Sequence, residues 1–199
     1  MKNPFKNTIF LFGITKYNKL PEDLGTEILL SGRSNAGKSS ALNALTQNKK
    51  LARISKTPGR TTEINFFQVE DDFKLLDLPG YGFAKSGQSR RKDWGPLLGE
   101  YFEKRESLKA VVVFMDIRHP LKEIDLEMID LCKEFEVPFI LVLAKADKVS
   151  RSIALKTQQE VQKQTDALDV IATSNLKNTG FDKLSKVLLR YRDDQAIVS

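Results

Sequence analysis

Cysteine, histidine and long apolar runs are scarce in this sequence. The single cysteine, Cys132, excludes an intrachain disulfide, and its place on an apolar helix face predicts a buried structural thiol in a reducing cytoplasm. No apolar run is long enough to span a bilayer, and the N-terminus has no long apolar region, so neither a membrane contact nor a signal peptide is expected. The only histidine, His119, precedes Pro120 and is expected to have a local structural role.

The chain has 199 residues, of which 41% are hydrophobic, and these values suit one α/β domain with a sizeable core. We expect a single domain over 1–199, with an N-terminal extension at 1–26, a frayed tail at 193–199 and a monomeric state. The formal net charge is +6. Such an excess favours a polyanionic partner, with nucleic acid as the first candidate.

Strand and helix patterns alternate along the chain. The runs Ala110–Met115 and Pro138–Ala144 are almost wholly apolar, which is typical of central parallel strands covered on both faces. Ile64–Val69 and Phe73–Asp77 are joined at Asp71–Asp72, and so short a polar connection predicts an antiparallel hairpin. We therefore expect an α/β fold with a mostly parallel, doubly wound sheet of about six strands, one antiparallel strand, and helices on both faces.

The segment Gly32–Ser39 fits the pattern G-x-x-x-x-G-K-[ST] at every fixed position. An apolar strand precedes it and a run of good helix formers follows it, which is the context that this motif requires. Backbone N–H groups of such a loop form a nest for phosphate oxygens, and the helix N-terminus adds partial positive charge. Lys38 can reach the outer phosphates, and the Ser39 hydroxyl can bind Mg²⁺.

Four further motifs follow in a consistent order, three of them at the ends of predicted strands, where ligands bind in such sheets. The carboxylate of Asp77 can hold Mg²⁺ through water, and the Gly80 N–H can face a γ-phosphate. The hydroxyl of Thr61, in a polar loop, can close onto Mg²⁺. The carboxylate of Asp147 matches the two adjacent donors of guanine, and Lys145 can pack along the base plane. The turn Thr173–Asn175 can also contact the base.

This set of motifs resembles the small GTP-binding proteins of the TrmE–Era–EngA–EngB group, and most closely its EngB family. The residues that carry the resemblance are Gly32–Ser40, Lys56–Thr61, Asp77–Gly82, Asp116–Pro120, Lys145–Lys148 and Leu176–Gly180. The resemblance implies a Ras-like P-loop GTPase fold and a bacterial GTPase that acts in assembly of the large ribosomal subunit. It also implies that Asn35 helps to hold a K⁺ ion near the phosphates. Ala144 departs from the family pattern, which often has Thr or Asn there, so one side-chain hydrogen bond near the base is missing.

These motifs and the resemblance together define a predicted GTP-binding site. Its GTP-binding residues are Gly32, Arg33, Ser34, Asn35, Ala36, Gly37, Lys38, Ser39, Ser40, Gly59, Arg60, Thr61, Asp77, Gly80, Lys145, Asp147, Lys148, Thr173, Ser174 and Asn175. Lys38, Thr61 and Gly80 are the predicted catalytic residues, and Ser39 and Thr61 the predicted Mg²⁺ ligands. Tyr81 stands where Ras-like enzymes place a glutamine that orients water, so slow intrinsic hydrolysis is expected.

The expected partners are GTP or GDP and the rRNA of an assembling large subunit. The basic residues Lys85, Arg90, Arg91 and Lys92 follow the predicted γ-phosphate sensor and are the first candidates for RNA contact. Two alternatives remain open. One is an RNA-binding assembly scaffold that holds GTP or GDP with negligible turnover, which Tyr81 makes credible. The other is a phosphoryl-transfer enzyme that uses the same loop, against which Asp147 argues.

Overall fold

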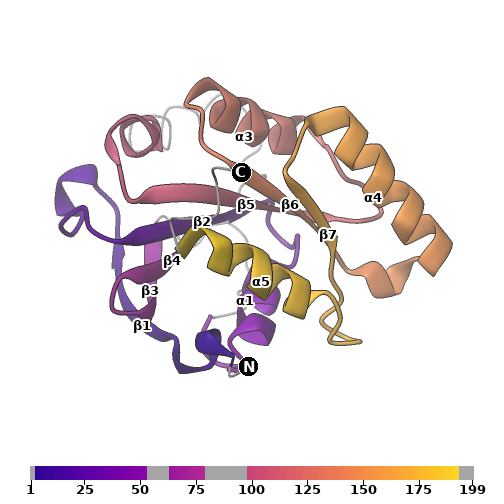
Figure 1. The fold of residues 1–199 in the computed structure, drawn as a ribbon, viewed down its shortest axis with the longest axis horizontal. Helices are drawn as coiled ribbons and strands as arrows, with labels where there is room; N and C mark the ends of the chain where they lie inside the picture. Colours follow the sequence, from indigo (N-terminus) through magenta and orange to yellow (C-terminus); the bar gives the residue numbers. More distant parts are fainter. Residues whose placement is uncertain (1–2, 53–62, 79–97, 193–199) are drawn as a thin grey trace.

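A computed structural model of the chain describes residues 3–52, 63–78 and 98–192. Seven strands form one sheet in the order β1-β3-β4-β2-β5-β6-β7 (Figure 1). The strands are β1 (Ile9–Ile14), β2 (Thr26–Gly32), β3 (Ile64–Glu70), β4 (Phe73–Asp77), β5 (Leu108–Asp116), β6 (Phe139–Ala144) and β7 (Asp169–Ala172). Strand β3 runs antiparallel to both neighbours, β1 and β4, and the other ladders are parallel.

The predicted α/β fold with one antiparallel strand is therefore confirmed. The sheet has seven strands rather than about six, because β1 joins its edge from within the segment expected as an N-terminal extension. The apolar runs predicted as central strands are β5 and β6, and both are buried along nearly their whole length. Burial on both faces explains why neither run shows the alternation of a half-exposed strand.

Helices cover both faces of the sheet. Among the described residues these are α1 (Lys38–Leu45), α3 (Glu123–Glu134), α4 (Arg151–Thr165), α5 (Phe181–Arg192), a helical stretch at 98–104, and the 3-10 turns η1 (Pro4–Asn7), η2 (Tyr17–Lys19) and η3 (Ala146–Lys148). Helices α1 and α5 pack on one core cluster, and α3, α4 and the 98–104 stretch pack on the other. No helix in the described ranges is long and apolar enough to cross a membrane.

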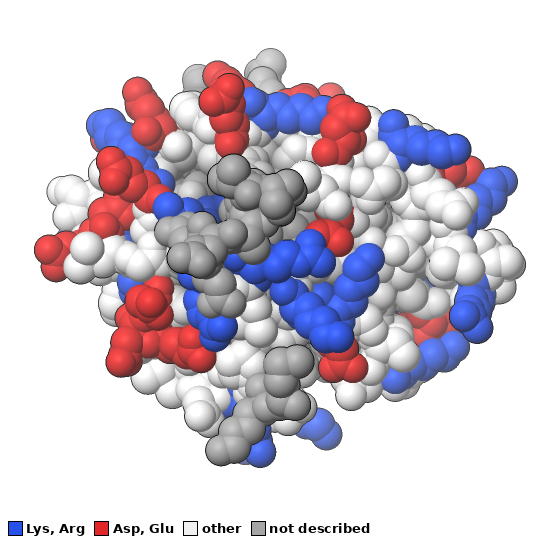
Figure 2. Space-filling model, viewed as in Figure 1, with Lys and Arg blue, Asp and Glu red and all other residues white. Residues whose placement is uncertain are grey.

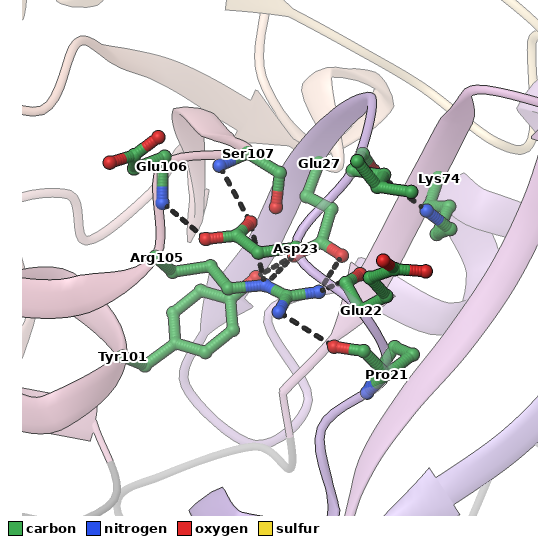
Figure 3. A network of polar contacts seen from close by, with 10 residues as sticks. Pro21, Glu22, Asp23, Glu27, Lys74, Tyr101, Arg105, Glu106 and Ser107 are labelled. Carbon is green, nitrogen blue, oxygen red and sulfur yellow. Dashed lines mark hydrogen bonds and ion pairs between the residues drawn. The ribbon is translucent and has the colours of Figure 1, made fainter.

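A buried charge network lies where β2 begins (Figure 3). The side chain of Glu27 is fully buried, and its carboxylate accepts hydrogen bonds from the Tyr101 hydroxyl and the Arg105 guanidinium, the latter at 2.7 and 3.0 Å. The guanidinium also donates to the carbonyl of Pro21 at 2.8 Å and to that of Glu22 at 3.2 Å. The network therefore fixes the chain before β2 to the end of the 98–104 helix.

Replacing Tyr101 with phenylalanine is expected to lower the free energy of unfolding by about 1.5–3 kcal/mol, since a hydrogen bond to a charged group is lost while Arg105 still pairs with Glu27. Burial and the Glu27 charge raise the pKa of Tyr101 well above its ordinary value of 10.0. The proton stays on the folded form longer, so this contribution is present below pH 10 and is lost as the pH rises further. Denaturant unfolding at pH 8 and above pH 10 measures both effects. An equal difference between the two proteins at both pH values would contradict the assigned role.

Candidate nucleotide-binding site

The loop between β2 and α1 needs both of its motif glycines. A Cβ on Gly32 would lie only 2.7 Å from the carbonyl oxygen of Phe114, its partner on β5, so no larger residue fits the ladder there. Gly37 is the N-cap of α1 and has φ of 104°, a backbone conformation that side chains with a Cβ rarely adopt. The sequence therefore folds this loop tightly onto the start of a helix, where backbone N–H groups can bind an anion.

Lys38, the first residue of α1, is almost completely buried and forms an ion pair with Asp77. Asp77 ends β4, which runs parallel to β2 with Leu30 opposite Asp77, so the sheet register brings the two charges together. A phosphate group of a ligand can compete with the Asp77 carboxylate for the amine of Lys38, since both are anions. Ser39 and Ser40 follow on α1 and are half-buried.

Arg33 lies in the loop but directs its side chain away from the helix start. Its guanidinium donates to both carboxylate oxygens of Asp125 at 3.1 Å and to the carbonyl of His119 at 2.9 Å. The Asp125 side chain is fully buried at the start of α3, and this burial raises its pKa. Arg33 can therefore serve a ligand through its backbone, while its side chain fixes the loop to α3.

Lys145 connects the phosphate loop to the turn that follows β6, at the carboxyl end of the sheet. It follows β6 in the left-handed conformation, and its amine donates to the carbonyl of Asn35 at 2.6 Å and to Asp116 at 3.0 Å. Hydrogen bonds from Arg118, and then from Lys145, hold the pKa of Asp116 well below its usual range. A hydrogen bond from Lys145 therefore connects the phosphate loop directly to the Lys145–Lys148 turn, and Lys145 is only two residues before Asp147.

Ala144 lies at the same junction. A Cβ on Gly37 would lie 3.3 Å from that of Ala144, so the small side chain packs beside the glycine of the phosphate loop.

Asp147 is held by the turn that follows β7. The Ser174 hydroxyl donates to one carboxylate oxygen at 2.7 Å, and this hydrogen bond is the main reason that the pKa of Asp147 is lowered. The backbone of Ala146 donates to the Thr173 carbonyl at 2.9 Å. Thr173 and Ser174 are buried, whereas Asn175 and Lys148 are exposed. Asp147 is therefore an ionised acceptor in a fixed orientation at neutral pH.

Replacing Ser174 with alanine is expected to weaken guanine nucleotide binding about fivefold, because a lost hydrogen bond of about 1 kcal/mol leaves the Asp147 carboxylate less well oriented. Titration with a fluorescent GDP analogue measures the change, and Ser185→Ala on α5 is the matched control. Affinity equal to that of the control would remove Ser174 from the base site.

The structure brings four of the predicted segments together at the carboxyl end of the sheet. They are the phosphate loop, Asp77, the Lys145–Lys148 turn and Thr173–Asn175. The predicted residues Gly59, Arg60, Thr61, Gly80, Tyr81, Lys85, Arg90, Arg91 and Lys92 lie outside the described residues. Sequence reasoning assigned no role to Asp125, Asp116 or Arg118. Asp116 and Arg118 belong to a segment that resembles the family, and nothing local marks Asp125 as the partner of Arg33.

A loop with the G-x-x-x-x-G-K-[ST] motif contacts the Lys145–Lys148 turn at the carboxyl end of a parallel sheet, and this arrangement is typical of P-loop GTP-binding proteins. The chain is a GTPase of this class. Residues 27–145 match the family described as 50S ribosome-binding GTPase. The chain is 50% identical over 193 residues to the probable GTP-binding protein EngB of Glaesserella parasuis, covering 94% of this chain and 92% of that protein. Identity to EngB of Haemophilus influenzae is 48%, with 94% of each chain covered.

The chain belongs to the EngB family of GTP-binding proteins, and the predicted resemblance is confirmed. A solved structure of a probable GTP-binding protein EngB has the same fold, with a TM-score of 0.69 at 20% identity, covering 85% of this chain and 100% of that one.

Proposed function

We propose that the chain is a GTP-dependent switch in assembly of the bacterial large ribosomal subunit. The observation that supports this most directly is the match of residues 27–145 to a family described as 50S ribosome-binding GTPase. In this proposal the chain is a single GTP-binding domain, acts as a monomer in the cytoplasm, and binds the rRNA of an assembly particle. Its product is a conformational change that is timed by GTP hydrolysis.

The roles of the site residues follow from their chemistry. Lys38 would leave Asp77 and bind the outer phosphates, which frees the Asp77 carboxylate. Asp147 would accept hydrogen bonds from guanine, and Lys145 would keep the base turn in contact with the phosphate loop. Thr61 and the Gly80 N–H would respond to the γ-phosphate, and Tyr81 would leave intrinsic hydrolysis slow.

The donor set near Lys38 suits Mg²⁺ shared with phosphates. Within the described ranges no group of three or more His, Cys, Asp or Glu residues could hold a metal ion by itself. Ser39, the residue after Lys38 on α1, would supply one hydroxyl and Thr61 another, and the Asp77 carboxylate would hold the ion through water. These are hard oxygen ligands that Mg²⁺ accepts together with phosphate oxygens. When bound, the ion neutralises charge on the phosphates. We also propose that K⁺ binds near Asn35, and equal turnover in K⁺ and Na⁺ would remove that part.

The test compares hydrolysis with and without purified large-subunit particles. Slow hydrolysis that particles stimulate by about tenfold or more, equal to about 1.4 kcal/mol of barrier, would support the switch. Co-sedimentation with a GTP analogue, GDP or no nucleotide should show that particle binding depends on the nucleotide.

The alternative, which Tyr81 favours, is an RNA-binding scaffold with negligible turnover. Nucleotide-dependent particle binding without any stimulated hydrolysis would favour it. Binding to no particle in any nucleotide state would contradict both functions.

A further inference from the structure

The carboxylate of Asp116 lies between two cations at the carboxyl end of the sheet. Asp116 is the last residue of β5 and pairs with Ala144, the last residue of β6, so the sheet register places it beside Lys145. The N–H of Ile117 also donates to the Ala144 carbonyl at 3.0 Å. Two paired strands therefore fix the position of Asp116 relative to Lys145.

Arg118 fixes the orientation of this carboxylate. Its Nε donates to Oδ1 of Asp116 at 2.9 Å, its terminal nitrogen to Oδ2 at 2.7 Å, and its backbone N–H to Oδ1 at 3.1 Å. Two parallel hydrogen bonds from a guanidinium add geometric specificity to an ion pair. Oδ2 also accepts a hydrogen bond from the Lys145 amine at 3.0 Å, so Arg118 orients the same oxygen that Lys145 uses.

The Lys145 amine has two acceptors. It donates to Asp116 and, at 2.6 Å, to the carbonyl of Asn35 in the phosphate loop. The Lys145 side chain is 33% exposed, and a lysine has a flexible stem and a strongly hydrated amine. A single neutral carbonyl would therefore leave the amine free to turn into water, and the charged second acceptor keeps it at the phosphate loop.

Stabilisation of the fold does not explain this arrangement. The Arg118 side chain is 45% exposed and lies two residues from Asp116, and a partly exposed ion pair of this kind adds little to stability. Attraction of a nucleotide does not explain it either, because a carboxylate near bound phosphates repels them. The effect of Asp116 on Lys145 accounts for a negative charge at this place.

We propose that Asp116 is a positioning residue for the guanine nucleotide and acts by holding Lys145 between the phosphate loop and the base turn. The inference deepens the proposed function and rests on the role that this function gives to Lys145. Because the amine is already held before the nucleotide arrives, binding does not have to restrict a flexible side chain, and such preorganisation raises affinity. The stem of Lys145 would then be set to pack along the base plane.

The experiment uses the full chain, Asp116→Ala, and the matched control Asp130→Ala, which removes an exposed carboxylate from α3. Asp and Glu side chains are spread over the surface among Lys and Arg (Figure 2), so the control should bind nucleotide as the unmodified chain does. Titration with a fluorescent GDP analogue measures affinity. Asp116→Ala should bind about tenfold more weakly than the control, because a hydrogen bond between two charged groups is lost.

The conservative variant Asp116→Asn keeps an oxygen that can accept from Lys145. Its loss of affinity should have the same sign and be smaller than that of Asp116→Ala. It takes the place of Asp116→Ala in every comparison if thermal unfolding shows that the alanine variant is not folded.

A double-mutant cycle distinguishes positioning from a general effect on the fold. Lys145→Met keeps an apolar stem and removes the amine, so in this background Asp116→Ala should change the affinity by less than about twofold. An equally large loss in both backgrounds would overturn the inference. Lys145→Met binding as tightly as the unmodified chain would overturn it as well.

The direction of the change is a second test. If charge alone mattered, loss of the carboxylate would favour an anionic ligand, and Asp116→Ala would bind the GDP analogue more tightly. Tighter binding, or affinity equal to that of the control, would contradict the positioning role. Co-sedimentation of the unmodified chain with large-subunit particles tests the proposed switch separately, so the two failures can be told apart.

Discussion

Replacing Lys38 with alanine is expected to lower GTP affinity by about two to three orders of magnitude. In the proposed complex the amine donates to phosphate oxygens, and charge-assisted hydrogen bonds contribute about 1.5–3 kcal/mol each. Lys38 is the first residue of α1, which follows β2. Because β2 and β4 are paired with Leu30 opposite Asp77, the start of α1 lies near Asp77, and Lys38 forms an ion pair with it. Isothermal titration with GTP and GDP measures the loss, which should be larger for GTP because the terminal phosphate also loses its partner.

The same substitution should destabilise the protein, because it leaves the largely buried Asp77 carboxylate without its cation. Removing one partner of a buried pair costs about 3–5 kcal/mol, and the slight exposure of Asp77 places the expected loss at the lower end of that range. The double variant Lys38→Ala/Asp77→Asn is the control: it should recover much of the stability and none of the affinity. GTP affinity close to that of the unmodified chain would remove Lys38 from the phosphate site.

The fold could be predicted because its strands are marked locally. Apolar runs such as those of β5 and β6, glycines before a helix, and polar residues at strand ends are all patterns within a few neighbouring residues. The same holds for the phosphate loop and for Asp147, whose chemistry depends on position at a strand end. Gly59, Arg60, Thr61 and Gly80 stay predictions.

The contacts that orient the site could not be predicted in this way. Arg33 pairs with Asp125, which is 92 residues away, and Arg105 pairs with Glu27, which is 78 residues away. The periodicity of apolar residues indicates which side of a helix or strand is buried. It does not indicate which charged residue, distant in the sequence, forms an ion pair with that element. A glutamate at the start of an otherwise apolar strand was a usable signal, since a carboxylate is seldom buried without a partner. It indicates that a cation is needed there without identifying Arg105.

Replacing Asp147 with asparagine is expected to lower affinity for GTP and GDP by about two to three orders of magnitude. The Asp147 carboxylate matches the N1–H and exocyclic amine of guanine, and a site built around such donors discriminates strongly once a partner is wrong. The Ser174 hydroxyl donates to one carboxylate oxygen, and an amide oxygen can accept the same hydrogen bond. The fold should therefore be kept while the amide nitrogen replaces the second acceptor.

Xanthine provides the sharper test, because it has a carbonyl oxygen where guanine has its amine. An amide nitrogen would donate to that oxygen, so Asp147→Asn should bind xanthosine diphosphate more tightly than the unmodified chain does. Competition against a fluorescent GDP analogue measures all the nucleotides, with the exposed Asp182→Asn as the matched control. A fall in guanine affinity without a gain for xanthine would indicate damage to the loop rather than altered recognition. Unchanged guanine affinity would show that base selection does not depend on Asp147. The assignment of a guanine nucleotide to the carboxyl end of the sheet would then fail.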